Sequence, residues 1–320
     1  MPYIRQGLRK GGACMQILVI SGFLGAGKTT FIKKLVEMTG ERFVVLENEY
    51  GQLPVDGSLL QDSGAAARGD LNIWELTEGC ICCSVKADFA TSILTIANTL
   101  DPKFLIVEPT GVGMLSNIIR NIGKISYDRI RLLRPITIID ANCFEEDLAQ
   151  YDEIYCDQIA HAGRILLSKT ERMAEDQVRV VAGRLRTLAE SPVIETGHYD
   201  SMPADWWRNL LQTPSGRPVL AEAGEVDPPD LESVAFEDLQ FGTHGELVRL
   251  LESTIRGDYG IIKRAKGCVK IGGLDARFDV VSGSYSITGI AEPTANNAVF
   301  IGRRLNAALL EQQLAARQFC

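Results

Sequence analysis

Residues 22–29 have the types and the spacing of a loop that binds a polyphosphate. They read Gly-Phe-Leu-Gly-Ala-Gly-Lys-Thr and match the pattern G-x-x-x-x-G-K-[ST] at every fixed position. Glycines allow backbone N–H groups to surround the phosphates, and a following helix adds the positive end of its dipole. The pattern predicts that Lys28, in an exposed loop, contacts the β- and γ-phosphates and that the Thr29 hydroxyl binds Mg²⁺.

The segments on either side of this loop favour the same interpretation. Residues 17–20 are apolar and largely β-branched, which predicts a buried strand, and residues 30–38 predict a helix. A strand, a glycine-rich loop and a helix in this order give the context of a phosphate site, so a chance match is the weaker alternative. The residues expected to contact the nucleotide are Gly22, Gly25, Ala26, Gly27, Lys28, Thr29 and Thr30.

A second apolar run, residues 104–107, ends in Glu108-Pro109-Thr110-Gly111. In phosphate-loop proteins an acid at such a strand end holds Mg²⁺, and the amide of a following glycine can sense the γ-phosphate. We therefore expect Glu108 to share Mg²⁺ with Thr29 and to act with Lys28 in catalysis, and Gly111 to contact the nucleotide. The alternative is a strand that only ends in a Glu-Pro turn.

A third strand end carries residues that could recognise the base of a nucleotide. Ser168, Lys169 and Glu171 follow the apolar run 165–167, at a place where guanine-specific proteins commonly carry Asn-Lys-x-Asp. The acid accepts hydrogen bonds from guanine N1–H and from its amino group, a donor pair that adenine lacks. These residues predict a guanine site, and the alternative is a helix N-terminus capped by Ser168 or Thr170 with Glu171 in its first turn.

Three cysteines within four residues form a candidate metal site ahead of a predicted helix at 85–100. They are Cys80, Cys82 and Cys83. A helix N-terminus lowers the pKa of a thiol, and clustered thiolates suit Zn²⁺ or another borderline ion. The alternatives are redox chemistry and buried inert cysteines, an interpretation that suits Cys143 and Cys156 better.

The turn Glu47-Asn48-Glu49-Tyr50-Gly51 follows the predicted strand 43–46. Its acids and amide could face either the Mg²⁺–γ-phosphate site or the cysteine site. We therefore expect a loop that senses the nucleotide. The alternative is a polar turn that only closes a strand.

The elements that position these residues are apolar runs separated by helical stretches. The predicted strands are 17–20, 43–46, 71–76, 104–107, 136–139, 165–167 and 192–195. Continuous hydrophobicity indicates burial on both faces, which predicts an α/β fold with a mostly parallel central sheet. The chemically distinctive residues follow these strands, as expected for a site at their carboxyl ends.

A segment rich in proline, glycine and acids, residues 212–232, predicts a linker between two domains. Beyond it we expect strands at 234–241, 261–271, 277–288 and 297–301 and helices at 244–256 and 305–317. This order predicts a small α+β domain of ferredoxin-like character over 233–320. Residues 15–211 form the nucleotide-binding domain, and residues 1–14 are expected to be a loose extension.

Composition limits the function classes. The 320 residues carry a formal net charge of −8, which argues against a nucleic-acid surface as the main function. No apolar run is long enough to span a membrane, and a signal peptide is rejected because cleavage would destroy the phosphate loop. Eight cysteines, most of them scattered, fit a reducing, cytoplasmic location better than a disulfide framework.

Together these motifs resemble the CobW-type family of metallochaperone GTPases. The matching segments are the phosphate loop at 22–29, the turn at 47–51, Gly-Cys-Ile-Cys-Cys at 79–83, Glu-Pro-Thr-Gly at 108–111 and Arg-Ala-Lys-Gly at 264–267. The last is similar to that family's Arg-x-Lys-Gly signature in its small C-terminal domain. The resemblance therefore covers about residues 15–320.

The resemblance implies slow, Mg²⁺-dependent GTP hydrolysis in a GTP-binding domain over 15–211. It also implies Zn²⁺ or Co²⁺ at Cys80, Cys82 and Cys83, with Glu47 as an additional ligand. The ion would be delivered to a client metalloenzyme or a corrinoid-pathway protein. Ser168 and Glu171 depart from the usual guanine motif, and the three histidines are too far apart in sequence for bulk metal storage.

The mechanism that we expect is a nucleotide switch in which GTP and Mg²⁺ order the loops at 47–56 and 108–113 beside the cysteines. Two other classes remain open. One is a phosphate-loop kinase or ATPase that acts on a small molecule, and the other is a non-catalytic structural-zinc or redox protein. The oligomeric state is also open, with a homodimer among the alternatives.

Overall fold

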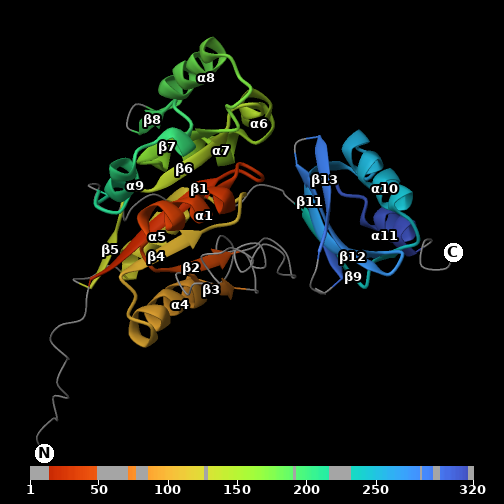
Figure 1. Ribbon diagram of the computed structural model, residues 1–320, viewed down its shortest axis with the longest axis horizontal. Helices are drawn as coiled ribbons and strands as arrows, with labels where there is room; N and C mark the ends of the chain where they lie inside the picture. Colours follow the sequence, from red (N-terminus) through yellow and green to blue (C-terminus); the bar gives the residue numbers. More distant parts are fainter. Residues whose placement is uncertain are drawn as a thin grey trace, which may run out of the picture.

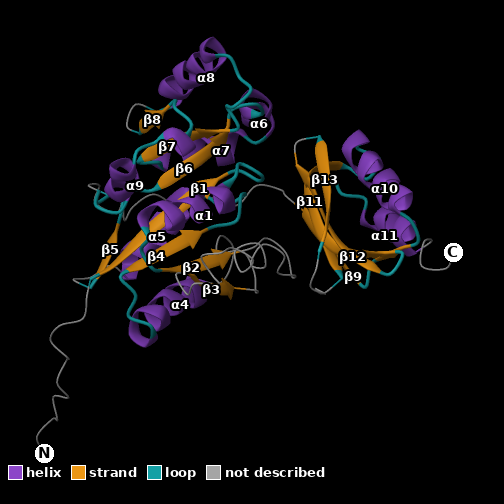
Figure 2. Ribbon diagram, in the orientation of Figure 1, coloured by secondary structure: helices purple, strands orange, loops and turns teal. Residues whose placement is uncertain are grey.

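The computed structural model describes residues 14–48, 71–76, 86–125, 129–189, 192–215, 232–281, 283–290 and 296–315. These residues form two domains, each built around its own sheet (Figure 1). Figure 2 shows the strands of each sheet gathered together, with described helices around the first sheet and on one side of the second.

The first sheet has the order β3-β2-β4-β1-β6-β7-β8, and β5 pairs with β1 off this path. Its strands are β1 (Met15–Gly22), β2 (Phe43–Asn48), β3 (Leu71–Leu76), β4 (Phe104–Glu108), β5 (Ile130–Leu132), β6 (Ile136–Asp140), β7 (Arg164–Ser168) and β8 (Val193–Glu195). All of these pairings are parallel. The predicted parallel sheet is confirmed, and the short strand β5 was not predicted.

Helices pack on both faces of the first sheet. They are α1 (Lys28–Thr39), α4 (Lys86–Thr99), α5 (Leu115–Ile125), α6 (Phe144–Gln150), α7 (Asp152–His161), α8 (Glu175–Leu188) and α9 (Ala204–Leu210). Strand β1 alternates between two cores: Leu18 and Ile20 pack with α1 and α9, whereas Ile17 and Val19 pack with α4 and α5. This double burial explains why the strand sequences are continuously apolar.

The second sheet has the order β13-β12-β11-β14-β9 and is antiparallel, with β10 added in parallel beside β11. Its elements are β9 (Glu232–Glu237), β10 (Gln240–Phe241), α10 (His244–Arg256), β11 (Ile261–Ile271), β12 (Leu274–Val281), β13 (Ser284–Gly289), β14 (Asn297–Arg303) and α11 (Ala307–Ala315). Both helices lie on the face away from the first domain (Figure 1). The predicted α+β character of this domain is confirmed.

Two predicted strands of this domain were wrong in extent. The segment 234–241 contains two strands, β9 and β10, interrupted at Asp238, whose φ is 56°. The segment 277–288 is part of the hairpin of β12 and β13, which turns at Gly283 with a φ of 75°. A left-handed backbone ends a strand locally, and glycine adopts it without a steric penalty.

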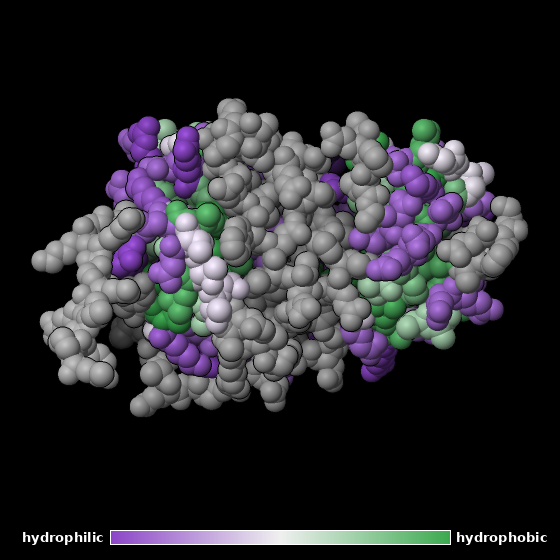
Figure 3. All heavy atoms as spheres, turned by 90° about the horizontal axis from the view of Figure 1, so that it is seen from below, coloured by the Kyte–Doolittle hydropathy of each residue, from purple (hydrophilic) through white to green (hydrophobic). Residues whose placement is uncertain are grey.

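Figure 3 shows hydrophilic side chains interspersed with apolar ones on both domains among the residues that it colours. None of the described helices is long and apolar enough to cross a membrane.

Candidate functional site

The phosphate loop joins β1, in the middle of the first sheet, to α1. Its glycines Gly22, Gly25 and Gly27 have φ values of 145°, 76° and 96°, which glycine adopts far more readily than other residues. Gly27 is the N-cap of α1, and no described side chain caps this helix. The first N–H groups of α1 are therefore left facing the loop, as a phosphate site requires.

Lys28 lies differently from the expectation. It is the first residue of α1 and only 6% exposed, and its Nζ donates to the carbonyl oxygen of Gly22 over 3.1 Å. The expectation of an exposed loop residue was wrong, because the side chain folds back along the loop. Its ammonium group is thus already held inside the curve of the phosphate loop.

The two predicted Mg²⁺ ligands are brought together. Thr29 Oγ1 donates to Glu108 Oε1 over 3.2 Å, although 79 positions separate these residues in the sequence. Glu47 lies opposite Glu108 in the β2–β4 register, and both carboxylates are buried, with exposed fractions of 4% and 8%. Hydroxyl and carboxylate oxygens are the donors that Mg²⁺ prefers, so this corner of the site fits that ion.

The loop after Glu108 packs directly on the phosphate loop. A Cβ atom at Gly111 would lie 2.6 Å from the backbone nitrogen of Leu24, so the approach leaves no room for a side chain. Gln158 of α7 is buried and donates from Nε2 to the carbonyl oxygens of Gly111 and Gly113, over 3.2 and 3.0 Å. The sequence analysis missed Gln158; its only signal is a polar residue between the apolar residues of α7.

Asp157 fixes the same region from the same helix. Its Oδ2 accepts a hydrogen bond from the backbone N–H of Ser116, at the start of α5, over 3.1 Å. Burial works to raise the pKa of Asp157, but hydrogen bonds from His161 and Ser116 outweigh it and hold that pKa below its usual value. The carboxylate is therefore charged near neutral pH and anchors α5 behind the loop.

Replacing Gln158 with leucine should lower the free energy of unfolding by about 1–3 kcal/mol, because two buried carbonyl groups lose their donor. Urea denaturation would measure this loss. The control is Gln212→Leu, since Gln212 is exposed and should change stability little. An unchanged urea midpoint for the Gln158 variant would contradict the anchoring role.

Ser168 was predicted to contact the guanine base. Its hydroxyl group instead contacts the phosphate loop. Its buried Oγ lies 2.7 Å from the carbonyl oxygen of Ala26 and 3.2 Å from that of Ile139. Helix α8 begins only at Glu175, with Ala174 as its N-cap. The alternative that Ser168 or Thr170 caps a helix was therefore wrong, and the serine links the end of β7 to the nucleotide loop.

Lys169 and Glu171 lie beyond this strand end. Lys169 has a φ of 58°, and its Nζ lies 2.7 Å from Oδ2 of Asp140, a strand-end acid that the sequence analysis missed. The side chain of Glu171 is 60% exposed, and its Oε1 lies 2.9 Å from Nε2 of His198. An exposed carboxylate at this edge of the sheet has the acceptor pair that guanine recognition needs.

The cysteine cluster, Cys80, Cys82 and Cys83, lies outside the described residues, as do residues 49–51 of the predicted sensing turn. Within the described residues, no group of three or more His, Cys, Asp or Glu side chains could hold a metal ion. Of the cysteines expected to be buried, Cys156 is exposed and Cys143 is half-buried. That expectation was wrong, because Cys156 lies on the outer side of α7.

The sequence pattern of one family, described as "CobW/HypB/UreG, nucleotide-binding domain", matches residues 16–194. The chain belongs to this CobW/HypB/UreG family. The matched range contains the phosphate loop, Glu108 and the residues at 168–171. It ends before the C-terminal domain, whereas the resemblance of the motifs extended to residue 320.

Members of this family that the chain is similar to include two curated zinc chaperones. "Zinc chaperone CobW" of Sinorhizobium sp is 30% identical over 203 residues, which are 55% of this chain and 57% of that protein. "Zinc chaperone YeiR" of Escherichia coli strain K12 is 33% identical over 207 residues, 62% of this chain and 60% of that protein. The chain thus spans less than two thirds of the length of these relatives.

The chain is also similar to a solved structure described as "Crystal structure of Zn(II)-bound YjiA GTPase from E. coli". The two chains are 22% identical, with a TM-score of 0.46, and the match covers 95% of this chain and 98% of that one.

Proposed function

We propose that this chain is a slow GTPase that binds a transition metal ion and delivers it to a client metalloenzyme or a corrinoid-pathway protein under nucleotide control. The observation that carries the proposal is the hydrogen bond between Thr29 and Glu108. It joins the phosphate loop to an acidic strand end and completes the corner where Mg²⁺ and the γ-phosphate would meet. Family membership and the names of the relatives support the same function.

In this mechanism the phosphate loop binds and orients the triphosphate. The residues proposed to form the GTP site, directly or through a neighbour, are Gly22, Gly25, Ala26, Gly27, Lys28, Thr29, Thr30, Gly111, Ser168, Lys169 and Glu171. Thr29 and Glu108 would hold Mg²⁺, which supplies positive charge to the β- and γ-phosphates when bound. Lys28 adds charge at the same place, and Ser168 acts indirectly by fixing Ala26.

The cargo of the proposed chaperone is Zn²⁺ or Co²⁺, held by Cys80, Cys82 and Cys83 with Glu47 as an additional ligand. Glu47 lies beside Glu108 at the carboxyl ends of β2 and β4. The same edge of the sheet would therefore supply ligands for both Mg²⁺ and the transported metal ion. We propose that nucleotide-dependent ordering of the loops at 47–56 and 108–113 changes the metal affinity. A coupling of about 1–3 kcal/mol would change it roughly 5–150-fold.

The proposed division of the chain places the GTP-binding domain at 15–211, a linker at 212–232 and the C-terminal domain at 233–320, after an extension at 1–14. We propose a cytoplasmic location, with no membrane or nucleic-acid partner, and leave open a homodimer. Competition for Zn²⁺ and Co²⁺ with a chromophoric chelator, with and without GTP–Mg²⁺, tests the function. Metal affinities that do not respond to the nucleotide would contradict it.

Replacing Glu171 with alanine should reduce the preference for GTP over ATP by about 10–100-fold, because two hydrogen bonds to a charged acceptor are lost. Binding of GDP and ADP, measured by calorimetry, should show the same loss of base preference. Asp200→Ala is the matched control, since Asp200 is the other acid beside His198, with 3.6 Å between Oδ2 and Nδ1. Equal affinities of the wild type for GTP and ATP would contradict the guanine site and favour the kinase or ATPase alternative.

A further inference from the structure

The C-terminal sheet has one apolar face, and its opposite face carries several charged side chains. Side chains alternate along a strand, so Phe278 and Val280 of β12 pack in the core with α10 and α11, and Asp279 lies on the opposite face. Lys266 of β11 is directly opposite Asp279 in the antiparallel register. Arg264 also lies on this face, with its Nη2 3.4 Å from Oδ2 of Asp279.

This charged face is turned toward the first domain and contacts the phosphate loop. A Cβ atom at Gly25 would collide with the side chain of Val281, the last residue of β12. Val299 and Ile301 of β14 belong to the same buried cluster as Phe23 and Leu24. The outer side of the phosphate loop is thus covered by the C-terminal sheet.

An ion pair and a hydrogen bond further along β11 and β14 hold the same interface. Lys263 of β11 forms an ion pair with Asp147 of α6, and Nη1 of Arg303 donates to the carbonyl oxygen of Gln150 over 2.8 Å. Both contacts reach α6 and not the phosphate loop. A variant of one of these residues would therefore weaken the contact between the domains without directly affecting nucleotide binding.

Lys266 is a second buried cation at this interface, with an exposed fraction of 6%. The charges that act on it come from both domains: Asp279 and Arg277 from its own sheet, and Glu47 and Lys28 from the first domain. Glu47 is the penultimate residue of β2, and Lys28 is the residue that should contact the β- and γ-phosphates. The C-terminal domain therefore places an amine within electrostatic range of the lysine that should contact the phosphates.

The surroundings of Lys266 favour an additional anion. Burial lowers the pKa of Lys266 to about 7, and the attraction of Asp279 and Glu47 does not offset it, while Lys28 and Arg277 add repulsion. A phosphate group brought in by Lys28 would supply negative charge at this point. Charge-assisted hydrogen bonds from ammonium to phosphate are among the stronger ones in proteins.

We propose that Lys266 is a phosphate-binding residue that the C-terminal domain supplies to the nucleotide site, where it favours the triphosphate over the diphosphate. The inference rests on the proposed function, since it requires that the chain bind GTP. It gives the Arg-Ala-Lys-Gly segment at 264–267 a role in the nucleotide cycle. Loss of the γ-phosphate would remove the ligand of Lys266 and weaken the hold of the C-terminal sheet on the phosphate loop.

The test measures affinities for a non-hydrolysable GTP analogue and for GDP, each with Mg²⁺, in the full chain. Lys266→Gln should weaken binding of the GTP analogue at least about tenfold while changing GDP binding about threefold or less. Lys266→Arg should keep most of the preference because it keeps the charge. Lys266→Met, which retains the apolar stem, should behave like the glutamine variant and serves if that variant unfolds.

Lys263→Gln is the matched control, because Lys263 is also a buried lysine of β11 that reaches the first domain. It should leave the ratio of the two affinities unchanged. An unchanged ratio in Lys266→Gln and Lys266→Met, or the same change in Lys263→Gln, would overturn the inference. A wild type that binds neither nucleotide would instead contradict the proposed function, so the two failures are distinguishable.

Discussion

Lys28→Ala is expected to abolish tight nucleotide binding, with a loss of affinity for GTP of at least about 100-fold. Removing one partner of a buried, charged hydrogen bond costs about 2–5 kcal/mol, and the Lys28 ammonium would contact two phosphates. The fold should survive, because Lys28 does not belong to the apolar core and its hydrogen bond to Gly22 lies within the loop. Isothermal titration calorimetry with GTP and Mg²⁺ measures the affinity, and thermal unfolding checks the fold.

The control for this variant is Lys34→Ala in the same helix. Lys34 lies further along α1, beyond the phosphate loop, and its partly exposed side chain pairs with Glu37, with 3.3 Å between Nζ and Oε2. This variant should bind GTP as the wild type does, since exposed ion pairs contribute little. Unchanged GTP affinity in Lys28→Ala would remove the basis for a nucleotide site in this loop.

The second large effect is expected at the cysteines. Replacing Cys82 and Cys83 together by serine should lower the affinity for Zn²⁺ by more than about 100-fold. Mutation of a residue that only hydrogen-bonds to a metal ligand typically lowers metal affinity about 10–100-fold, and loss of two ligands should cost more. GTP binding should remain, because the phosphate loop is a separate segment. Competition with a zinc-binding dye measures the first quantity, and Cys143→Ser with Cys156→Ser is the control.

Chelation distinguishes a transferable metal ion from a structural one. Closed structural zinc sites have apparent binding free energies of about 10–16 kcal/mol, and their loss unfolds small domains. A delivery site should bind less tightly, so a chelator should strip the metal ion while circular dichroism stays unchanged. GTP–Mg²⁺ should alter the stripping rate. Unfolding on chelation, with no influence of nucleotide, would identify structural zinc and exclude the chaperone.

The sequence predicted the first sheet well because several of its strands contain a continuous apolar run, at 17–20, 43–46, 104–107 and 165–167. Residues 71–76 were predicted as a strand with the bounds that the structure has. Strand β5 is only Ile130–Leu132, too short for periodicity to identify. In the C-terminal domain the face of β12 opposite its core carries both Asp279 and Val281, and this mixture breaks the alternation that would have marked the β12–β13 hairpin.

The site was predictable only in part, because motifs identify residue types and not the partners that they meet. Thr29 and Glu108 were paired in advance from the chemistry of Mg²⁺ sites. In contrast, no spacing indicates that Ser168 reaches Ala26, that Gln158 holds Gly111, or that a lysine from another domain lies near Lys28. These contacts depend on how the elements pack after the strands are in place.

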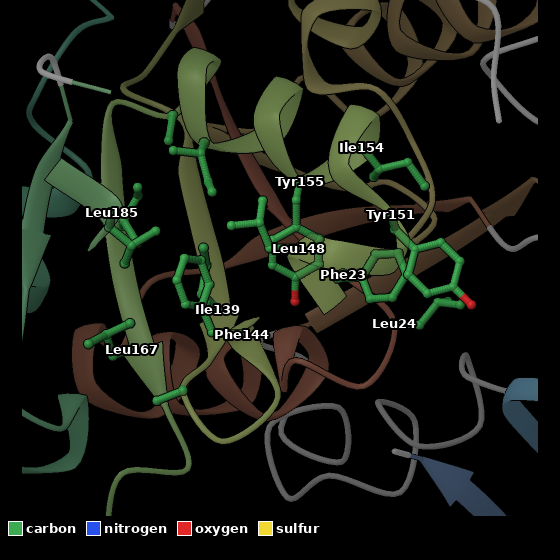
Figure 4. Close-up of a cluster of buried hydrophobic side chains, with 14 of the residues drawn as sticks. Phe23, Leu24, Ile139, Phe144, Leu148, Tyr151, Ile154, Tyr155, Leu167 and Leu185 are labelled. Atoms are coloured by element: carbon green, nitrogen blue, oxygen red, sulfur yellow. The ribbon is translucent and has the colours of Figure 1, made fainter. Parts of the chain in front are cut away.

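The apolar side chain of Phe23, between the glycines of the phosphate loop, fixes the conformation of the loop before a nucleotide binds. Figure 4 shows Phe23 packed beside Tyr151 and Tyr155. The ring centroid of Phe23 lies 4.8 Å from that of Tyr151 and 5.2 Å from that of Tyr155. Fixing a backbone costs about 1–2 kcal/mol of conformational entropy per residue, and here the core imposes that loss during folding. The loop is therefore preorganised, and an incoming nucleotide would meet a rigid receptor whose affinity is not reduced by an ordering step.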